Sequence, residues 1–258
     1  MSHADHDSPR SQTAPLGVQL YSVRDDIGPE QLSGTLRALA AMGFTHVEPY
    51  RILDDTDKLA ATLEETGLRA TAAHANVVTA ERDDYLAAAR RLGLGTLIVP
   101  WTDPERLRDR DGIAAVAGAI NDAARVAAGQ GIRVGYHNHD FEFSQHVDGV
   151  PAYEILTDAL DESVGLEVDT HWASVGGADV LALLPRLGDR VRFLHVTNEP
   201  PDDDPPVLGV DIAGRMDEVI AAGRGLGAMT VLEIVVHEGD VFPVLERNAA
   251  FFRKLVDA

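Results

Sequence analysis

A short unit recurs along this chain and limits what the chain can fold into. Each copy is a helical pattern rich in alanine, leucine and arginine, then a glycine, then a short apolar run. The glycines of these copies are Gly43, Gly67, Gly93, Gly131, Gly165, Gly188 and Gly227. A glycine just past a helix supplies its left-handed cap, and an apolar run of this length is typical of a strand buried on both faces. The repeat therefore predicts strands that alternate with helices.

With the opening run LGVQLYSV, the pattern predicts eight strands and eight helices. The strands are expected near 16–22, 45–50, 69–75, 96–101, 132–137, 164–169, 191–197 and 229–236. The helices are expected near 29–42, 56–66, 80–92, 112–129, 151–161, 178–187, 213–226 and 241–256. Eight such units in about 250 residues are typical of a (β/α)8 barrel, because parallel strands need helical crossovers. We expect an α/β fold, a single-domain TIM barrel over residues 16–258, after a flexible N-terminal leader of residues 1–15.

An open, doubly wound sheet is the alternative for alternating strands and helices. No strand is followed by G-x-G-x-x-G or by G-x-x-x-x-G-K-[ST], so neither usual nucleotide-binding loop is present. Two connections are longer or more unusual than a simple turn requires, namely 138–150 and the acidic, proline-rich 198–211. In a barrel, these loops would lie over the face that carries the site.

The composition excludes several classes of chemistry. The chain has 42 acidic and 22 basic residues and a formal charge of -20, which repels a phosphate backbone, so we expect no nucleic-acid partner. The sequence contains no cysteine, which removes thiolate nucleophiles and cysteine-bound metals. The two lysines, Lys58 and Lys254, fall in helical patterns, which disfavours a Schiff-base enzyme.

The sequence also lacks the usual signals for export or membrane insertion. Residues 1–15 are polar and do not resemble a secretory signal, and no stretch approaches the roughly 18 apolar residues of a membrane span. We therefore expect a cytoplasmic protein with no membrane partner. Barrels of this size often associate, so homo-oligomer formation stays open.

Polar side chains gather where the predicted strands end, which is where TIM barrels carry their chemistry. They are Tyr21, Arg24, Glu48, His74, Trp101, His137, His139, Glu142, Asp169, His171, His195, Glu233 and His237. A single histidine at such a place is more often a half-buried structural residue than a ligand. The concentration of six histidines at these ends is what indicates a site.

Asp169, His195 and Glu233 end otherwise apolar strands, where a charge needs partners. These strands are the sixth, seventh and eighth, which are neighbours in a closed barrel. Two carboxylates and an imidazole suit a divalent metal ion such as Mn²⁺, Mg²⁺, Co²⁺ or Zn²⁺. A fourth ligand is expected from the fifth strand, where Glu142 is the nearby glutamate. The alternative is a buried cluster in which arginines pair with the carboxylates.

Several motifs together resemble the sugar phosphate isomerase/epimerase family of xylose isomerase-like TIM barrels. They are GVQLYSVRD, GFTHVE, YHNHDFEF, LEVDTHW, LHV and LEI, of which YHNHDFEF is the most specific, and they run from about residue 16 to the C-terminus. The resemblance implies one divalent ion, held by Glu142, Asp169, His195 and Glu233. Other branches of the superfamily place the strand-5 glutamate earlier, where this chain has Tyr136 or His137, so His137 or His139 is the alternative fourth ligand.

The sequence departs from the family pattern in two places. Thr197 stands where the branch usually has a lysine, and the glycine-acidic motif that follows is reduced to LGVD at 208–211. The absence of that lysine removes a fixed positive charge from the pocket, which favours a neutral sugar or glycoside over a phosphorylated one.

The resemblance implies a divalent-metal-dependent sugar isomerase or epimerase that acts through an enediolate on a sugar or keto-sugar. Glu142 and Glu233 are expected to combine metal binding with proton transfer, and His139 is a candidate general base. The residues expected to contact the carbohydrate substrate are Glu48, His74, His137, His171, Trp101 and Trp172. A lyase that eliminates a substituent from a 3-keto-glycoside is an alternative with the same metal site. A catalytically lapsed carbohydrate-binding or partner subunit is the non-enzyme alternative. The charge argues against a DNA-repair endonuclease.

Overall fold

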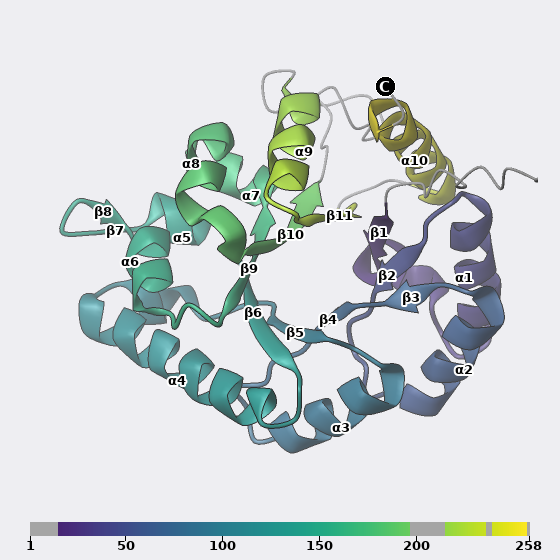
Figure 1. Ribbon diagram of the computed structural model, residues 1–258, viewed down its shortest axis with the longest axis horizontal. Coiled ribbons are helices and arrows are strands. Elements are labelled where there is room, and N and C mark those ends of the chain that lie inside the picture. Colours follow the sequence, from purple (N-terminus) through teal and green to yellow (C-terminus); the bar gives the residue numbers. More distant parts are fainter. Residues whose placement is uncertain (1–14, 197–214, 236–238, 257–258) are drawn as a thin grey trace, which may run out of the picture.

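The chain folds as the predicted TIM barrel in a computed structural model that describes residues 15–196, 215–235 and 239–256 (Figure 1). Its strands form one parallel sheet in the order β3-β2-β1-β11-β10-β9-β6-β5-β4. They are β1 Leu16–Gln19, β2 His46–Glu48, β3 Arg69–Ala70, β4 Ala72–His74, β5 Thr96–Val99, β6 Arg133–His137, β9 Gly165–Asp169, β10 Val191–Val196 and β11 Met229–Leu232. The strand order follows the chain around the barrel.

The third predicted strand is split at Thr71 into β3 and β4, and these two pieces close the barrel. The Thr71 carbonyl accepts hydrogen bonds from the backbone amides of Gly95 and Thr96, on the side of β5. On the other side, the amide of His74 donates to the carbonyl of Pro49, just after β2. The backbone of the third strand therefore bonds to both neighbours, which leaves little open sheet edge.

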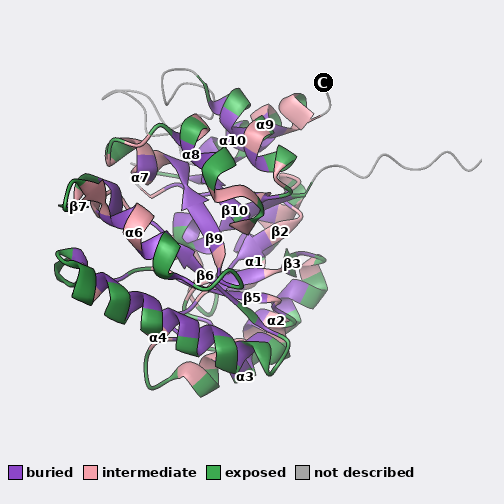
Figure 2. Ribbon diagram, turned by 60° about the vertical axis from the view of Figure 1, so that its left-hand side comes forward, coloured by how far each residue is buried: buried purple, intermediate pink, exposed green. Residues whose placement is uncertain are grey.

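Helices surround the strands as an outer ring (Figure 1). The longer ones are α1 Leu32–Ala41, α2 Thr56–Thr66, α3 Arg82–Leu92, α4 Arg110–Ala128, α6 Ala152–Ala159, α8 Val180–Leu187, α9 Met216–Gly225 and α10 Phe242–Val256. Shorter elements are η1 Leu20–Asp26, η2 Pro104–Leu107, α5 Phe141–Ser144, α7 Thr170–Val175, η3 Gly188–Arg190 and the hairpin of β7 His146–Val147 with β8 Val150–Pro151. Buried and exposed residues alternate along the ring, as α4 shows in Figure 2, so each helix packs one apolar face on the barrel.

Most helix-ending glycines behave as predicted. Gly67 and Gly93 take left-handed backbone angles directly after α2 and α3, the conformation that glycine adopts without steric cost. Gly165 does not, because it is the first residue of β9.

The first strand is shorter than the predicted 16–22. The Gln19 side chain accepts a hydrogen bond from the Tyr21 amide, and this bond starts η1 instead of extending β1.

The long loop 138–150 contains α5 and the β7–β8 hairpin. The predictions for Thr197, 198–211 and His237 lie outside the described residues. No helix of the described part of the chain is both long and apolar enough to span a membrane.

Two separate clusters of apolar side chains fill the protein, one inside the barrel and one between the strands and the helices. Ala72, Ile98, Phe193 and Val231 form this inner cluster, with Met229 packed against it. Gly135 of β6 lies in the same layer, since a Cβ atom there would come within 2.6 Å of Ile98 Cδ1 and 3.3 Å of the Gly165 carbonyl oxygen. The barrel interior is therefore packed without space for one more methyl group at this position.

Gly135→Ala should destabilise the protein by about 1–3 kcal/mol, the usual cost of adding a methyl group to a packed core. Gly118→Ala is the matched control, because Gly118 is exposed in α4 and nothing lies within 4 Å of its added Cβ atom. That change should stabilise by about 0.5–1 kcal/mol, the helix preference of alanine over glycine. Urea unfolding of the two variants measures both effects, and equal stabilities would contradict the packing described here.

Candidate metal centre and substrate cavity

Buried ionisable side chains converge at the carboxyl ends of the strands, inside the barrel. Side chains two apart on a strand share a face, so Glu167 and Asp169 of β9 both point inward. The converging residues are Glu48, His74, His137, Glu167, Asp169, His195 and Glu233. All of these side chains except that of His74 are buried. Imidazoles, rather than the arginines of the alternative interpretation, face these carboxylates.

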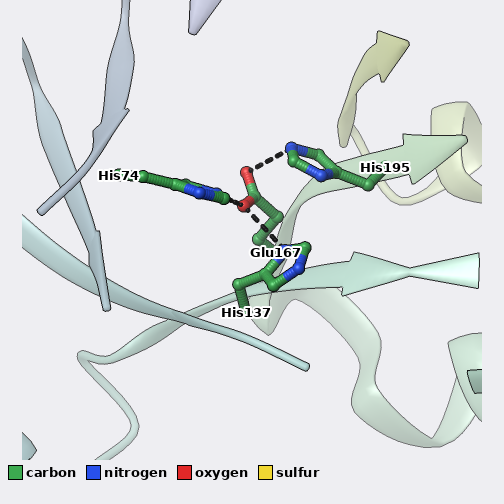
Figure 3. Close-up of side chains that lie close together, drawn as sticks. All are labelled: His74, His137, Glu167 and His195. Carbon is green, nitrogen blue, oxygen red and sulfur yellow. Dashed lines mark hydrogen bonds and ion pairs between the residues drawn. The ribbon is translucent and has the colours of Figure 1, made fainter. Parts of the chain in front are cut away.

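The deepest part of this cluster is centred on Glu167 (Figure 3). Glu167 Oε2 lies 2.7 Å from His74 Nε2 and 3.1 Å from His137 Nδ1. Glu167 Oε1 lies 3.3 Å from His195 Nε2. Glu48 joins from β2, with its Oε1 at 3.1 Å from His74 Nε2 and from His195 Nε2. We call Glu48, His74 and Glu167 the inner layer.

Asp169 and Glu233 form the layer above, nearer the loops. Glu233 Oε2 lies 3.1 Å from His195 Nδ1. Asp169 Oδ1 accepts a hydrogen bond from the Trp172 amide, which makes Asp169 the N-cap of α7. Its other oxygen, Oδ2, is buried without a hydrogen-bond partner in the described part of the chain. The Asn138 side-chain amide donates a hydrogen bond to the backbone carbonyl of Asp169 and accepts one from the backbone N–H of Asp169. These two bonds fix the position of Asp169.

Two groups of ligand atoms are close enough to hold an ion, with all atoms of a group within 4.8 Å of one another. One consists of His137, Asp169, His195 and Glu233, and the other of His74, His137, Glu167 and His195. The first group contains three of the four residues predicted as metal ligands. The ligand donors and the unpartnered Asp169 Oδ2 fit a divalent cation, because a buried carboxylate oxygen needs a proton or a cation.

The cluster shifts the pKa values of its members in opposite directions. Burial raises the pKa of Asp169 to about 8, and the Glu233 charge adds to this effect. Burial alone would lower the pKa of His195, but the Glu167 and Glu48 carboxylates hold that pKa well above its ordinary value. Burial would raise the pKa of Glu233, yet the hydrogen bond and charge of His195 lower it to about 2. Negative charge therefore dominates the site and attracts protons or cations.

Glu142 is not brought to the other predicted ligands. Its Oε1 accepts from the Tyr136 hydroxyl at 2.7 Å and its Oε2 from the His139 amide at 2.8 Å. Tyr136 packs in the core between strands and helices, so Glu142 lies behind the barrel wall, whereas its neighbour on the strand, His137, points inward. Burial raises the pKa of Glu142 to about 7. The group of potential ligand atoms with Asp169, His195 and Glu233 contains His137, the alternative strand-5 ligand, and not Glu142.

A cavity of about 440 Å³ opens above the cluster. Of the residues predicted to act in catalysis or contact substrate, its lining includes His74, Trp101, His137, His139, Trp172 and Glu233. Trp101 is 49% exposed and Tyr21 39%, unusual for aromatic side chains, and both lie on this lining. A concave site with aromatic walls and polar groups at its base is the usual form of a small-molecule site.

The remaining predicted site residues lie elsewhere. Glu48 is buried beneath the cavity and accepts a hydrogen bond from Gln19 Nε2 at 2.7 Å. His171 lies in α7, with its ring packed against Trp172 at 4.9 Å, and is not part of the cavity lining.

His139, on the cavity lining, is neutral, because burial and the nearby His137 lower its pKa to about 3.

The sequence reasoning missed Glu167 and Asn138. Glu167 stands two residues before Asp169 in GLEVD, so the period of a strand could have placed the two carboxylates on one face. Asn138 follows a strand directly in YHNHDFEF, where polar residues of a TIM barrel face the site.

Comparison with known proteins supports the fold described above. No curated protein matches this sequence. A sugar phosphate isomerase/epimerase from Parabacteroides distasonis has a similar structure, with a TM-score of 0.80, 21% identity and coverage of 99% of this chain and 100% of that chain. The 3-keto-D-glucoside 4-epimerase of E. coli gives a TM-score of 0.68 and 17% identity over 93% of this chain and 99% of that chain.

A xylose isomerase-like TIM barrel protein from Mycobacterium smegmatis, in complex with magnesium, gives a TM-score of 0.65 and 16% identity over 95% of this chain and 97% of that chain. Such identities show a common fold. The sequence profile named xylose isomerase-like TIM barrel matches residues 36–246, which is most of the chain. The motif resemblance is thereby confirmed, and the protein belongs to the xylose isomerase-like TIM barrel family.

Proposed function

We propose that this protein is a divalent-metal-dependent sugar isomerase or epimerase that acts through an enediolate on a sugar or keto-sugar. The observation that carries the proposal is the convergence of His137, Asp169, His195 and Glu233 at the base of an aromatic-walled cavity. The names of the similar structures support it, because they include a sugar phosphate isomerase/epimerase and a keto-glucoside epimerase.

We assign the ion to His137, Asp169, His195 and Glu233 rather than to the group that contains Glu167. The two groups share His137 and His195, and a neutral imidazole has a single lone pair to offer. His137 and Glu233 line the cavity, so an ion between them can reach a substrate. Two imidazoles and two carboxylates suit Mn²⁺, Co²⁺, Zn²⁺ or Mg²⁺. When bound, such an ion supplies Lewis-acid polarisation of a substrate carbonyl.

The chain's own residues supply binding and proton transfer. Trp101 and Trp172 offer flat apolar faces to a sugar ring at the cavity wall. His74 lines the cavity, and the carboxylates of Glu167 and Glu48 outweigh its burial and raise its pKa to about 10, so it presents a charged hydrogen-bond donor to substrate hydroxyls. Glu233 is ionised and lines the cavity, and we assign it the removal of the proton next to the substrate carbonyl. The neutral His139 is the second group near the substrate.

Metal binding gives the first test of this proposal. Mn²⁺ at 100 times its dissociation constant should stabilise the wild type by about 2.7 kcal/mol. Asp169→Asn should weaken binding by roughly 100-fold or more, since loss of even an outer residue of a metal site costs about 10–100-fold. Titration calorimetry and thermal unfolding measure both effects. The exposed Asp158→Asn is the control for lost charge, and equal affinities in the two variants would contradict the ligand assignment.

The choice of His137 over Glu142 gives the second test. His137→Leu removes a proposed ligand and should lower the affinity for Mn²⁺ by roughly 100-fold, on the same reasoning as for Asp169. Glu142→Gln keeps an acceptor for the Tyr136 hydroxyl and should leave the affinity unchanged. The reverse order of affinities would restore Glu142 as the ligand.

Solvent deuterium tests the reaction class. Ketoses, aldoses and 3-keto-glycosides incubated in D₂O with the Mn²⁺-loaded protein should incorporate deuterium next to the carbonyl, because proton removal there is reversible. Glu233→Gln should slow this exchange by about 10²–10⁴-fold, the usual contribution of a general base, whereas the exposed Glu246→Gln should not. Release of the aglycone from a 3-keto-glycoside would identify a lyase instead. If no substrate exchanges or reacts, enediolate chemistry is wrong.

A further inference from the structure

Glu167 is neither a proposed metal ligand nor a proposed base, yet its carboxylate lies among three imidazoles. It is fully buried in the middle of β9 and does not line the cavity. Three imidazoles from three other strands surround it, those of His74, His137 and His195 (Figure 3). A buried carboxylate is retained only where such partners compensate its lost hydration.

Hydrogen bonds to Glu167 and Glu48 determine which ring nitrogens of His137 and His195 face the inner carboxylates. A carboxylate only accepts hydrogen bonds, so each ring nitrogen that faces it must carry the hydrogen. His137 therefore has its hydrogen on Nδ1, which lies 3.1 Å from Glu167 Oε2. His195 donates from Nε2 to Glu48 Oε1 at 3.1 Å, and Glu167 Oε1 lies 3.3 Å from the same nitrogen without accepting a hydrogen bond.

The opposite nitrogen of His137 then carries the lone pair, and it faces the proposed metal position. His195 Nδ1 lies 3.1 Å from Glu233 Oε2, within the proposed ligand group, so it also carries a hydrogen until an ion replaces that hydrogen. His137 Nε2 is the ring nitrogen turned away from Glu167 in Figure 3, and His137 lines the cavity together with Glu233. The His137 imidazole therefore lies between Glu167 on one side and the proposed ion on the other.

We propose that Glu167 is a positioning residue that holds His137 in the tautomer that ligates the metal through Nε2. Hydrogen bonds from outer carboxylates to ligating histidines fix the ring orientation and the tautomer in metal sites generally. Here Glu167 accepts the hydrogen bond from His137, whereas Glu48 accepts the hydrogen bond from His195. This inference rests on the proposed function, because it needs the ion to bind at His137 and His195.

The wild type loaded with Zn²⁺, a diamagnetic ion, gives the direct test. Nitrogen-15 spectra of histidine-labelled protein distinguish protonated, metal-bound and free ring nitrogens, and loss of signals in His137→Leu and His195→Gln assigns the two rings. The expected pattern in His137 is a protonated Nδ1 with a metal-bound Nε2. The opposite tautomer in this ring overturns the proposal.

The variant Glu167→Gln tests the energetic consequence. Its amide nitrogen is a donor in nearly the same shape, so it pairs with a bare ring nitrogen and turns that ring's N–H toward the metal position. The affinity for Mn²⁺ should fall by roughly 10–100-fold, as for other outer residues of metal sites, and the His137 ring should change its nitrogen-15 pattern. A residue needed for folding alone would lower the melting temperature without changing the His137 tautomer.

Glu162→Gln is the matched control, because Glu162 is exposed shortly before β9. It should leave affinity and spectra as in the wild type. If the wild type binds one ion and Glu167→Gln binds it with the same affinity, the positioning role is wrong but the proposed function is not. A wild type that binds no ion overturns the proposed function instead. If Glu167→Gln does not fold, as circular dichroism would show, the wild-type spectra decide the question.

Discussion

The structure depends on keeping the Glu167 carboxylate inside the barrel without water. The effective penalty for burying an ion is several kcal/mol, so it is tolerated only where hydrogen bonds and opposite charge compensate it. Here the compensation comes from His74 of β4, His137 of β6 and His195 of β10. No local segment of chain could supply three such rings, because each belongs to a different strand. The buried charge and the closed barrel therefore require each other.

Strand register turns this requirement into a geometry. His137 pairs with Glu167 across β6 and β9, and His195 pairs with Asp169 across β9 and β10. The two carboxylates of β9 thus lie at successive levels along the strand, one beside each imidazole. Gln19 pairs with Glu48 in the same way, and its side chain donates to that carboxylate. A shift of one residue in any of these pairings would turn the polar side chains toward the helices, so the site and the barrel register are fixed together.

The same physics explains what the sequence could and could not predict. The strand positions were predictable because apolar runs alternate with capped helices, and Asp169, His195 and Glu233 were predictable because each ends such a run. Glu142 was assigned by its closeness in sequence to β6. Its side chain position depends on α5, which turns the chain so that Glu142 meets the outward Tyr136. Beyond the end of a strand, sequence spacing does not determine whether a side chain lies inside or outside the barrel. Within a strand it does, because side chains alternate, and Glu167 could therefore have been found from Asp169.

His137 in place of a carboxylate also changes the charge of the proposed centre. With Asp169 and Glu233 ionised and both imidazoles neutral, the ligand set carries two negative charges, which one divalent ion balances. A third carboxylate among the ligands would leave the centre negative, and a negative centre opposes the charge that develops on a substrate oxygen when the neighbouring proton is removed. The inner layer does not reverse this balance, since His74 lies between Glu48 and Glu167 with its pKa raised to about 10 by their charges. The positions of the imidazoles therefore limit the excess negative charge at the point where the substrate carbonyl would lie.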